Sequence, residues 1–448
     1  MEKVLIFDSA QDVRFKKVLA FIIPTYLTSL FNTVYTIVDG IFVSSYVGTN
    51  ALASINIAYP IVNVLTGIAL AFATGGSSLV ALHIGGKKTK EANQTFSVCV
   101  LLSMVIGCIL AGLIWLNLSP IFTFLGATTL TMTDCKTYAL WWLIGTPVVI
   151  GKELFTYFIR VDGSPTYSFL TALSGGVVNI VLDYIFVGRM QMGILGAALA
   201  TMLGLVFSFL MGLYYFLRLR HTLRFTTKEL AMKSGFKCVV NGTSEFINQL
   251  AIAITTIVFN RTAMTFAGED GIAAVSIIMY LQFLVLGVYF GFSMGIAPPL
   301  SYAYGDGKLD VCKILETYAR RFFTIAPLVL YAATYLLAPL GVSFFAELSS
   351  SVYELAISGM RIYGIGFLFC GINIYSAIRM MAYGKGFVSG IITFLRSFAL
   401  LLLFLIVLPM FWQMNGIWLA VPAAEMVTLV ILLFWIQPKV NMELQPAL

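Results

Sequence analysis

The sequence predicts an all-α polytopic membrane protein, with twelve transmembrane helices in two six-helix bundles related by pseudo-two-fold symmetry. Of its 448 residues, 60% are hydrophobic and 10% are charged, and the mean hydropathy is +0.94. Soluble domains carry about 25% charged residues. Apolar runs of about 20 residues, long enough to cross a hydrocarbon core of ~30 Å, recur along the whole chain. Because strand-type alternation is absent, these runs are expected to be helices.

Twelve apolar segments are the expected spans, and the lysines and arginines between them set their orientation. If both termini lie inside, 21 of these residues fall on inner segments and only three, Lys136, Arg189 and Arg261, on outer connections. Cytoplasmic loops carry such an excess. We therefore expect a multi-pass protein of the cell (inner or plasma) membrane with both termini cytoplasmic. The expected spans are 18–45, 52–82, 95–116, 137–157, 166–187, 193–217, 238–264, 272–302, 321–339, 354–377, 387–411 and 416–436.

The chain repeats itself at an offset of 220 residues. This shift aligns Gly48 with Gly268, Gly67 with Gly287, Gly75 with Gly295, Gly85 with Gly305 and Gly196 with Gly416. Six spans per repeat is an even number, so both halves enter the membrane from the same side, related by an axis along its normal. We expect an N-lobe at 1–217, a basic cytoplasmic linker at 218–237 and a C-lobe at 238–448, with a cleft between the lobes.

The absence of a G-x-x-x-x-G-K-[ST] motif and of any extended soluble domain argues against an ATP-driven pump. The expected driving force is an ion gradient; neither an enzymatic activity nor a cofactor beyond the coupling ion is expected. The net charge of +7 lies in short loops, which argues against a nucleic-acid partner. The expected partners are a small-molecule substrate and the lipid bilayer, and the expected state is a monomer.

Asn179 and Asp183 form a polar pair inside the fifth span. Their spacing of four places both on one helix face, and an acidic residue in a membrane helix marks a functional site by default. Asp39 and Thr201 lie at a similar depth, so the four side chains are predicted to converge on a cation- or proton-binding site. Carboxylate, amide and hydroxyl oxygens suit either H⁺ or Na⁺, and no other metal is expected. The alternative is that Asp183 pairs with Arg189 as a helix anchor.

The 220-residue shift places Phe259 opposite Asp39 and Val421 opposite Thr201, so this site is confined to the N-lobe. Arg396 with Glu425 or Glu245 would be a paired buried charge, for which a structural clamp is the simpler interpretation. Pro24 is the expected hinge of the first span. Polar, aromatic and methionine side chains are candidates for a cleft that binds bulky cationic ligands, although such residues also serve plain packing. These cleft candidates are Asn56, Asn63, Glu245, Gln249, Met279, Tyr280 and Gln282.

Several motifs resemble the multidrug and toxic compound extrusion (MATE) family. They are the stretch from Thr36 through Asp39-Gly40 to Gly48, the run from Gly75 to Gly85-Gly-Lys-Lys, and Arg160-Val-Asp-Gly163-Ser-Pro165 followed by Asn179-Ile-Val-Leu-Asp183. Gly196-Ala-Ala-Leu-Ala-Thr201 and Pro298-Pro-Leu-Ser-Tyr-Ala-Tyr-Gly305 also fit. The chain is most similar to the prokaryotic branch typified by the DNA-damage-inducible protein F.

The resemblance implies a secondary active multidrug antiporter that exports organic cations or amphipathic compounds in exchange for H⁺ or Na⁺ by rocking of two lobes. It assigns Asp39, Asn179, Asp183 and Thr201 to the ion site. An alternative is a flippase for lipid-linked oligosaccharide or polysaccharide precursors from the same superfamily, which the scarcity of basic residues within spans disfavours. A receptor or channel is a third class, disfavoured by the repeat and by the one-sided acidic pair.

Overall fold

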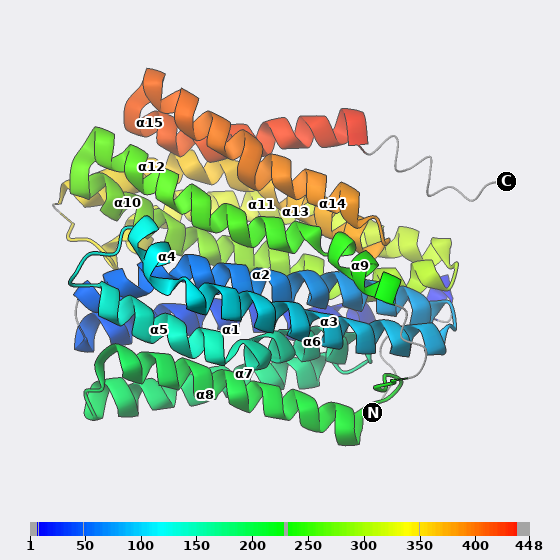
Figure 1. Cartoon of the computed structure of the whole chain (residues 1–448). Coiled ribbons are helices and arrows are strands. Elements are labelled where there is room, and N and C mark those ends of the chain that lie inside the picture. Colours follow the sequence, from blue (N-terminus) through cyan, green and yellow to red (C-terminus); the bar gives the residue numbers. More distant parts are fainter. Residues whose placement is uncertain (1–6, 8, 48, 228–231, 349, 437–448) are drawn as a thin grey trace.

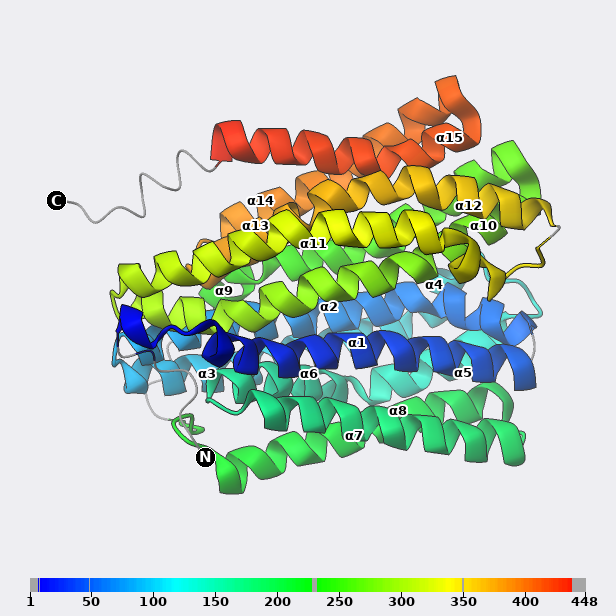
Figure 2. The same cartoon turned by 180° about the vertical axis from the view of Figure 1, so that it is seen from behind.

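The computed structural model describes residues 7, 9–47, 49–227, 232–348 and 350–436, and is helical throughout its ordered elements. Figures 1 and 2 show helices α1 to α8 gathered on one side and α10 to α15 on the other, with α1, α2 and α10 at the junction. We call these two groups the N-lobe and the C-lobe.

The N-lobe contains six spans. A short 3₁₀ turn, Ala10–Asp12, precedes the first. Helices α5 and α6 form one span that is bent by 56° around Gly145. The lobe consists of α1 (Phe15–Tyr46), α2 (Thr49–Gly85), α3 (Thr89–Leu116), the short α4 (Leu118–Phe124), α5 (Met132–Ile144), α6 (Thr146–Val161), α7 (Pro165–Asp183), which continues as a π-helical segment η2 (Tyr184–Arg189), and α8 (Gly193–Tyr214), which continues as η3 (Tyr215–Leu219).

The C-lobe repeats this plan with two helices that reverse direction at a single residue of positive φ, Gly268 in α10 and Gln413 in α15. The lobe consists of α10 (Thr243–Gly305), α11 (Leu309–Ser343), α12 (Ser351–Tyr363), η4 (Gly364–Gly366), α13 (Phe367–Ala382), α14 (Gly386–Phe394), η5 (Leu395–Ala399), α15 (Leu400–Ile431) and η6 (Leu432–Ile436), with α9 (Met232–Asn241) packed between the lobes.

Counted over the described residues, eight helices are long and apolar enough to cross a membrane, or nine with the bent pair α5–α6. The reversals at Gly268 and Gln413 each divide one of these nine into two spans, and α1 adds another. The result is the twelve spans that the sequence predicts. The short helix α4 between α3 and α5 was not expected. The outer surface is apolar, as lipid contact requires, with side chains such as Leu113, Leu328 and Leu336 more than half exposed.

The 220-residue repeat appears as a symmetric contact between the lobes. A Cβ built on Gly85 would lie 2.1 Å from the carbonyl oxygen of Tyr302, and one built on Gly305 would lie 2.1 Å from the carbonyl oxygen of Leu82. Gly305 is Gly85 shifted by 220, and Tyr302 is Leu82 shifted by 220. Since only glycine permits so close an approach, the matched glycines allow the lobes to touch in a pseudo-two-fold manner.

A second pair of contacts follows the same symmetry. A Cβ on Gly75 would lie 2.4 Å from the backbone nitrogen of Gly242, and one on Gly295 would lie 2.9 Å from the Cα of Ile22. Gly295 and Gly242 are the 220-residue partners of Gly75 and Ile22. These contacts cluster toward the end of the bundle that holds the turns at Lys87 and Asp306 and the segment 219–227, which we call the basic end.

Segment 219–227 is bound to the N-lobe by hydrogen bonds at the basic end. Asp162, in the turn between α6 and α7, accepts hydrogen bonds from the backbone nitrogens of His221, Thr222 and Leu223 at 2.7, 2.8 and 2.9 Å. The hydroxyl of Tyr215 donates to the same carboxylate at 3.0 Å. The expected linker 218–237 therefore includes a part bound to the N-lobe and the beginning of α9, and its boundaries stay a prediction.

Candidate functional site

The face of α7 that carries Asn179 packs against α8. A Cβ on Gly175 would lie 1.9 Å from Ser208 Oγ, and one on Gly204 would lie 2.6 Å from the carbonyl oxygen of Gly175 and 2.9 Å from the Cβ of Asn179. The two glycines thus let the helices approach until their backbones touch. As a result, Asn179 is held between α7 and α8, and Asp183 follows one turn later on the same face.

A small polar cavity of about 20 Å³ lies at this contact. Since about 10–15 Å³ is enough for one water molecule, the space suits a water-sized guest. Its polar lining comes from four helices: Asn32 and Tyr35 of α1, Lys152 of α6, Asn179 of α7, and Thr201 and Ser208 of α8. We call this space the N-lobe polar cavity.

The predicted site residues are placed as follows. Asn179 and Thr201 line the N-lobe polar cavity together. Asp183 is completely buried next to it along α7. Asp39 lies within α1, but its side chain is outside the described residues. Arg189, the alternative partner of Asp183, instead donates from Nε to the hydroxyl of Tyr184 at 2.8 Å, and no ion pair between Arg189 and Asp183 is found in the described part.

Asn179 is 3% exposed, yet neither of its side-chain polar atoms has a hydrogen-bond partner among the described residues. Leaving a buried polar group unpaired costs about 1–3 kcal/mol, so native structures rarely do so without a reason. An amide oxygen and nitrogen aimed at a water-sized cavity fit a site that takes up a small polar guest.

Lys152 was not singled out by the sequence analysis, although it lines this cavity. Its side chain is buried in the middle of the α5–α6 span, and its Nζ lies 2.8 Å from Glu153 Oε1. The sequence signal was two adjacent charges within an apolar run. Both charges lie inside an expected span, so a comparison of the charges in the loops does not include them.

A larger cavity of about 440 Å³ lies between the lobes, in the range of pockets that hold small molecules. The N-lobe contributes Ser29 and Asn32 of α1 and Tyr157 of α6; the C-lobe supplies most of the wall. Asn32 belongs to both cavities, so α1 separates the N-lobe polar cavity from this central cavity by a single side chain.

The central cavity contains three charged side chains among its described lining residues, Glu245, Arg396 and Glu425. Arg396 pairs with Glu425: Nη2 lies 2.9 Å and Nε 3.0 Å from Oε1. Asn373 donates from Nδ2 to Glu425 Oε2 at 2.7 Å. Of the two expected alternatives, Glu425 and not Glu245 is therefore the ion-pair partner of Arg396. Glu245 makes no ion pair or side-chain hydrogen bond within the described part, and its carboxylate is left for the cavity.

Four of the seven cleft candidates line the central cavity: Glu245, Gln249, Met279 and Gln282. Gln282 also accepts a hydrogen bond from the hydroxyl of Tyr363. The expected placement is not met for Tyr280, Asn56 and Asn63. Met279 and Gln282 are three residues apart and share one face of α10, whereas Tyr280 points outward and stacks on Phe345 at 5.9 Å. Asn56 is exposed and Asn63 half-buried on α2, and neither contributes to the wall.

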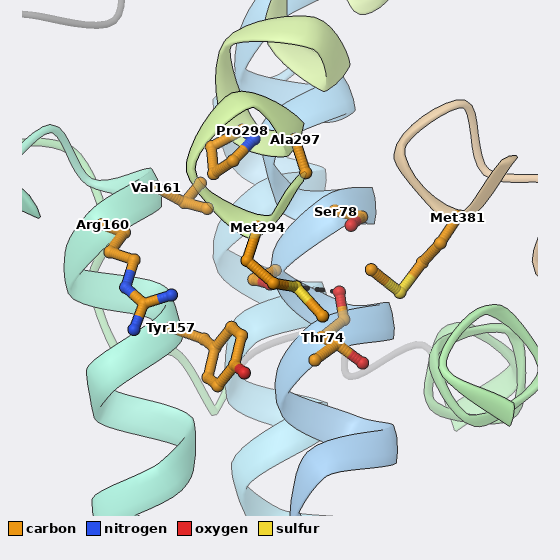
Figure 3. Close-up of a pocket in the computed structure, with 10 residues that line it drawn as sticks. Thr74, Ser78, Tyr157, Arg160, Val161, Met294, Ala297, Pro298 and Met381 are labelled. Carbon is orange, nitrogen blue, oxygen red and sulfur yellow. Dashed lines mark hydrogen bonds between the residues drawn. The ribbon is translucent and has the colours of Figure 1, made fainter. Parts of the chain in front are cut away.

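Toward the basic end the central cavity narrows to a void of about 10 Å³, which shares Tyr157 and Met294 with it. Figure 3 shows Met294 pointing between Tyr157 and Thr74, with Met381 approaching from the opposite side. Arg160 lies over the Tyr157 ring at 4.7 Å and donates from Nε to Ser168 at 3.2 Å. Tyr157, Arg160 and Met294 thus line this void together.

Pro24 lies inside α1, which stays continuous from Phe15 to Tyr46. The hydroxyl of Thr28 donates to the carbonyl oxygen of Pro24 at 2.8 Å. Because proline also removes an intrahelical bond, this segment is weakened at the level where α1 crosses α10, near Tyr26 and Gly291. Its role as a hinge stays a prediction.

Comparisons with known proteins agree with this architecture. The MatE family model matches residues 24–185. The multidrug export protein MepA of Staphylococcus haemolyticus is 26% identical over 80% of each chain, and MepA of Staphylococcus saprophyticus is 24% identical over 90% of this chain and 88% of its own.

Solved structures show the same fold. The crystal structure of MATE in complex with MaL6 superposes with a TM-score of 0.90 at 22% identity, covering 98% of this chain and 99% of that one. An outward-facing multidrug resistance MATE family transporter of the MOP superfamily gives a TM-score of 0.88 at 22% identity over 95% and 96% of the chains.

Two symmetry-related lobes of six spans, with a charged cavity between them, form a polytopic membrane protein with the fold of the solved MATE structures. The motifs of the N-lobe, the family model and the shared fold all point to one family. They support the MATE family of transporters as the family to which this chain is similar.

Proposed function

We propose that this protein is a secondary active multidrug efflux antiporter, which exports organic cations or amphipathic compounds in exchange for H⁺ or Na⁺ by rocking of its two lobes. The central cavity is the observation that carries the proposal. Its volume of about 440 Å³ and its mixture of aromatic, methionine and amide side chains suit bulky amphipathic ligands. The names of the MepA relatives, which are multidrug export proteins, support the same direction.

The charge of the cavity favours cationic substrates. The Arg396 guanidinium neutralises Glu425, so Glu245 is the one carboxylate of the described wall without an ion-pair partner. An isolated carboxylate in a low-dielectric cavity attracts a cation far more strongly than one in water. Phe283, Phe290 and Phe367 of the same wall add ring faces that bind cations.

The N-lobe polar cavity is the proposed coupling site, with Asn179, Asp183, Thr201 and Asp39 as its ion- or proton-binding residues. Ion binding there and substrate binding in the central cavity meet at Asn32, which lines both spaces. A change in the position of α1 therefore alters both sites together. This is the coupling that exchange requires, since each ligand must bias the same conformational equilibrium.

We further propose that the basic end faces the cytoplasm, as the charge of its turns and of segment 219–227 indicates. The protein then works as a monomer in the cell membrane with both termini inside. The branch typified by the DNA-damage-inducible protein F remains the proposed subgroup.

A lipid-linked precursor flippase would need several basic side chains to hold a pyrophosphate. Among the described residues of the central cavity, Arg396 is the single basic one, and Glu425 already occupies it.

Expression in a bacterial strain that lacks its own efflux pumps tests the function. The protein should lower the accumulation of a fluorescent organic cation such as ethidium, and dissipation of the ion gradients should abolish the effect. Undiminished accumulation with a well-expressed protein would contradict the proposal.

A further inference from the structure

Lys152 places a positive charge inside the proposed coupling site. It is 8% exposed and comes from the middle of the α5–α6 span. A basic side chain inside a membrane helix is rare and costly, and it usually faces a functional interior. Here it lines the same cavity of about 20 Å³ as Asn179 and Thr201.

The ammonium of Lys152 has more N–H donors than it has hydrogen bonds within the described part. Lysine carries three N–H donors, and in the described part only Glu153 accepts one of them, at 2.8 Å. Asn179, across the cavity, has an amide oxygen without a hydrogen-bond partner among the described residues. The oxygens that would coordinate a small cation thus share one space with a covalently attached cation.

The charged and titratable groups around Lys152 come from three helices. Glu153 and Arg160 lie on α6 itself, Tyr35 on α1, and Asp183 on α7, one turn beyond Asn179. Helix α8 contributes the hydroxyls of Thr201 and Ser208. The carboxylates of this region therefore already have two basic side chains in the same lobe, Lys152 and Arg160, that can balance their formal charges.

H⁺ and Na⁺ differ in the ligands and the volume that they need at a binding site. A sodium ion needs several oxygen ligands and the volume between them, and the cavity has room for about one water-sized guest. A second cation in that space would be repelled by the ammonium at close range. A proton needs no volume, because it becomes part of a carboxyl group that is already present.

We propose that Lys152 selects the coupling ion: its ammonium lines the N-lobe polar cavity as a tethered cation and repels Na⁺, so that this transporter exchanges its substrate for H⁺. The proposal rests on the antiport function proposed above and names the ion of that same site. Lys152 acts as a specificity residue.

The test measures Na⁺ binding to the purified full-length protein without transport. The melting temperature is followed as Na⁺ replaces choline at constant ionic strength. The main variant, Lys152→Met/Glu153→Gln, removes both charges of the pair and keeps the side-chain volume, so no buried carboxylate is left unpaired. Lys152→Arg keeps the charge, and Lys136→Met removes a lysine from α5, away from the cavity.

Wild type, Lys152→Arg and Lys136→Met should not respond specifically to Na⁺, whereas the double variant should melt about 5 °C higher once Na⁺ saturates its vacated site. Adding Thr201→Ala to the double variant should remove this response, which ties Na⁺ to the cavity. A Na⁺-specific shift in the wild type, or a double variant as indifferent as the wild type, would overturn the proposal. If the double variant does not fold, Lys152→Gln replaces it, and the wild-type titration alone still decides whether Na⁺ is excluded.

Transport separates this proposal from the antiport function. In proteoliposomes loaded with tetraphenylphosphonium, wild-type efflux should respond at least tenfold more to an imposed pH gradient than to an imposed Na⁺ gradient. Larger efflux under the Na⁺ gradient would refute the role of Lys152 but leave the antiport function intact. Absence of efflux under either gradient would instead refute the antiport function, with the melting data still valid for Lys152.

Discussion

Arg396 of η5 and Glu425 of α15 form a buried ion pair, with Nη2 2.9 Å and Nε 3.0 Å from the same carboxylate oxygen. Asn373 of α13 donates to the other oxygen at 2.7 Å, and Nη2 of Arg396 also donates to the sulfur of Cys370 at 3.4 Å. The pair therefore joins three segments of the C-lobe. It also neutralises Glu425 and leaves Glu245 as the one carboxylate of the described cavity wall without an ion-pair partner.

The Arg396–Glu425 pair should behave as a clamp whose partners depend on each other. Arg396→Met alone leaves a buried carboxylate without its counter-charge and should cost about 3–5 kcal/mol of stability. Arg396→Met/Glu425→Gln removes both charges and should recover most of that loss. Thermal unfolding of the single and double variants measures the coupling. Additive losses in the double variant would show that the pair is not an energetic unit.

Glu245 should determine the preference for cations. Glu245→Gln keeps the shape of the side chain but removes its charge, so an organic monocation should bind about tenfold more weakly, which corresponds to ~1.4 kcal/mol. A neutral amphipathic ligand should bind as before. Glu269→Gln is the matched control, because Glu269 lies on the same helix α10 but is exposed. Equal cation affinity of Glu245→Gln and Glu269→Gln, measured by fluorescence titration, would contradict the assignment.

Asp183 should matter for ion coupling more than Glu425 does. Asp183→Asn and Asp39→Asn each keep the side-chain size but remove the site of proton or cation uptake, so each should abolish drug efflux in a folded protein. Glu425→Gln should reduce ion-driven transport less. Resistance assays in a pump-deficient strain, with expression levels matched, make the comparison. Undiminished resistance with both aspartate variants would remove the N-lobe site from the mechanism, and a larger loss with Glu425→Gln would move coupling to the C-lobe.

The glycine contacts between the lobes should govern closure at the basic end. Gly85→Ala would place its Cβ 2.1 Å from the carbonyl oxygen of Tyr302, so the lobes must move apart, and Gly305→Ala should act in the same way through Leu82. Gly112→Ala on α3 is the control, since no atom lies within 4 Å of its added Cβ. Spin-label distances across the basic end should lengthen for the first two variants alone. Unchanged distances for all three would show that the contact does not hold the lobes together.

Much of the fold was predictable because its causes are local or periodic. Runs of apolar residues set the spans, and the 220-residue offset anticipated that Gly85 and Gly305 would be equivalent, as their mirrored contacts with Tyr302 and Leu82 confirm. Helix α4 escaped prediction because seven residues leave too short a pattern to recognise. The single-residue reversals at Gly268 and Gln413 fall in connections that the sequence expected.

The candidate site was predictable only where an unusual residue stood out against lipid. Asn179 and Thr201 were brought together by matching their depth, and they share a cavity. Lys152 was missed because its charge was not weighed with the polar residues of the other spans. Tyr280 was misplaced because sequence spacing shows which residues share a helix face but not which face meets a cavity. The choice of Glu425 over Glu245 as the partner of Arg396 likewise depends on tertiary packing.

The most direct test of ion-coupled exchange uses the purified protein in proteoliposomes loaded with tetraphenylphosphonium and free of nucleotide. Efflux is recorded first without a gradient, then with an imposed pH gradient, and then with an imposed Na⁺ gradient. An antiporter should release the cation faster under an inward ion gradient, with the pH gradient the effective one, and Asp183→Asn should lose this acceleration. Equal rates under all three conditions would contradict the account.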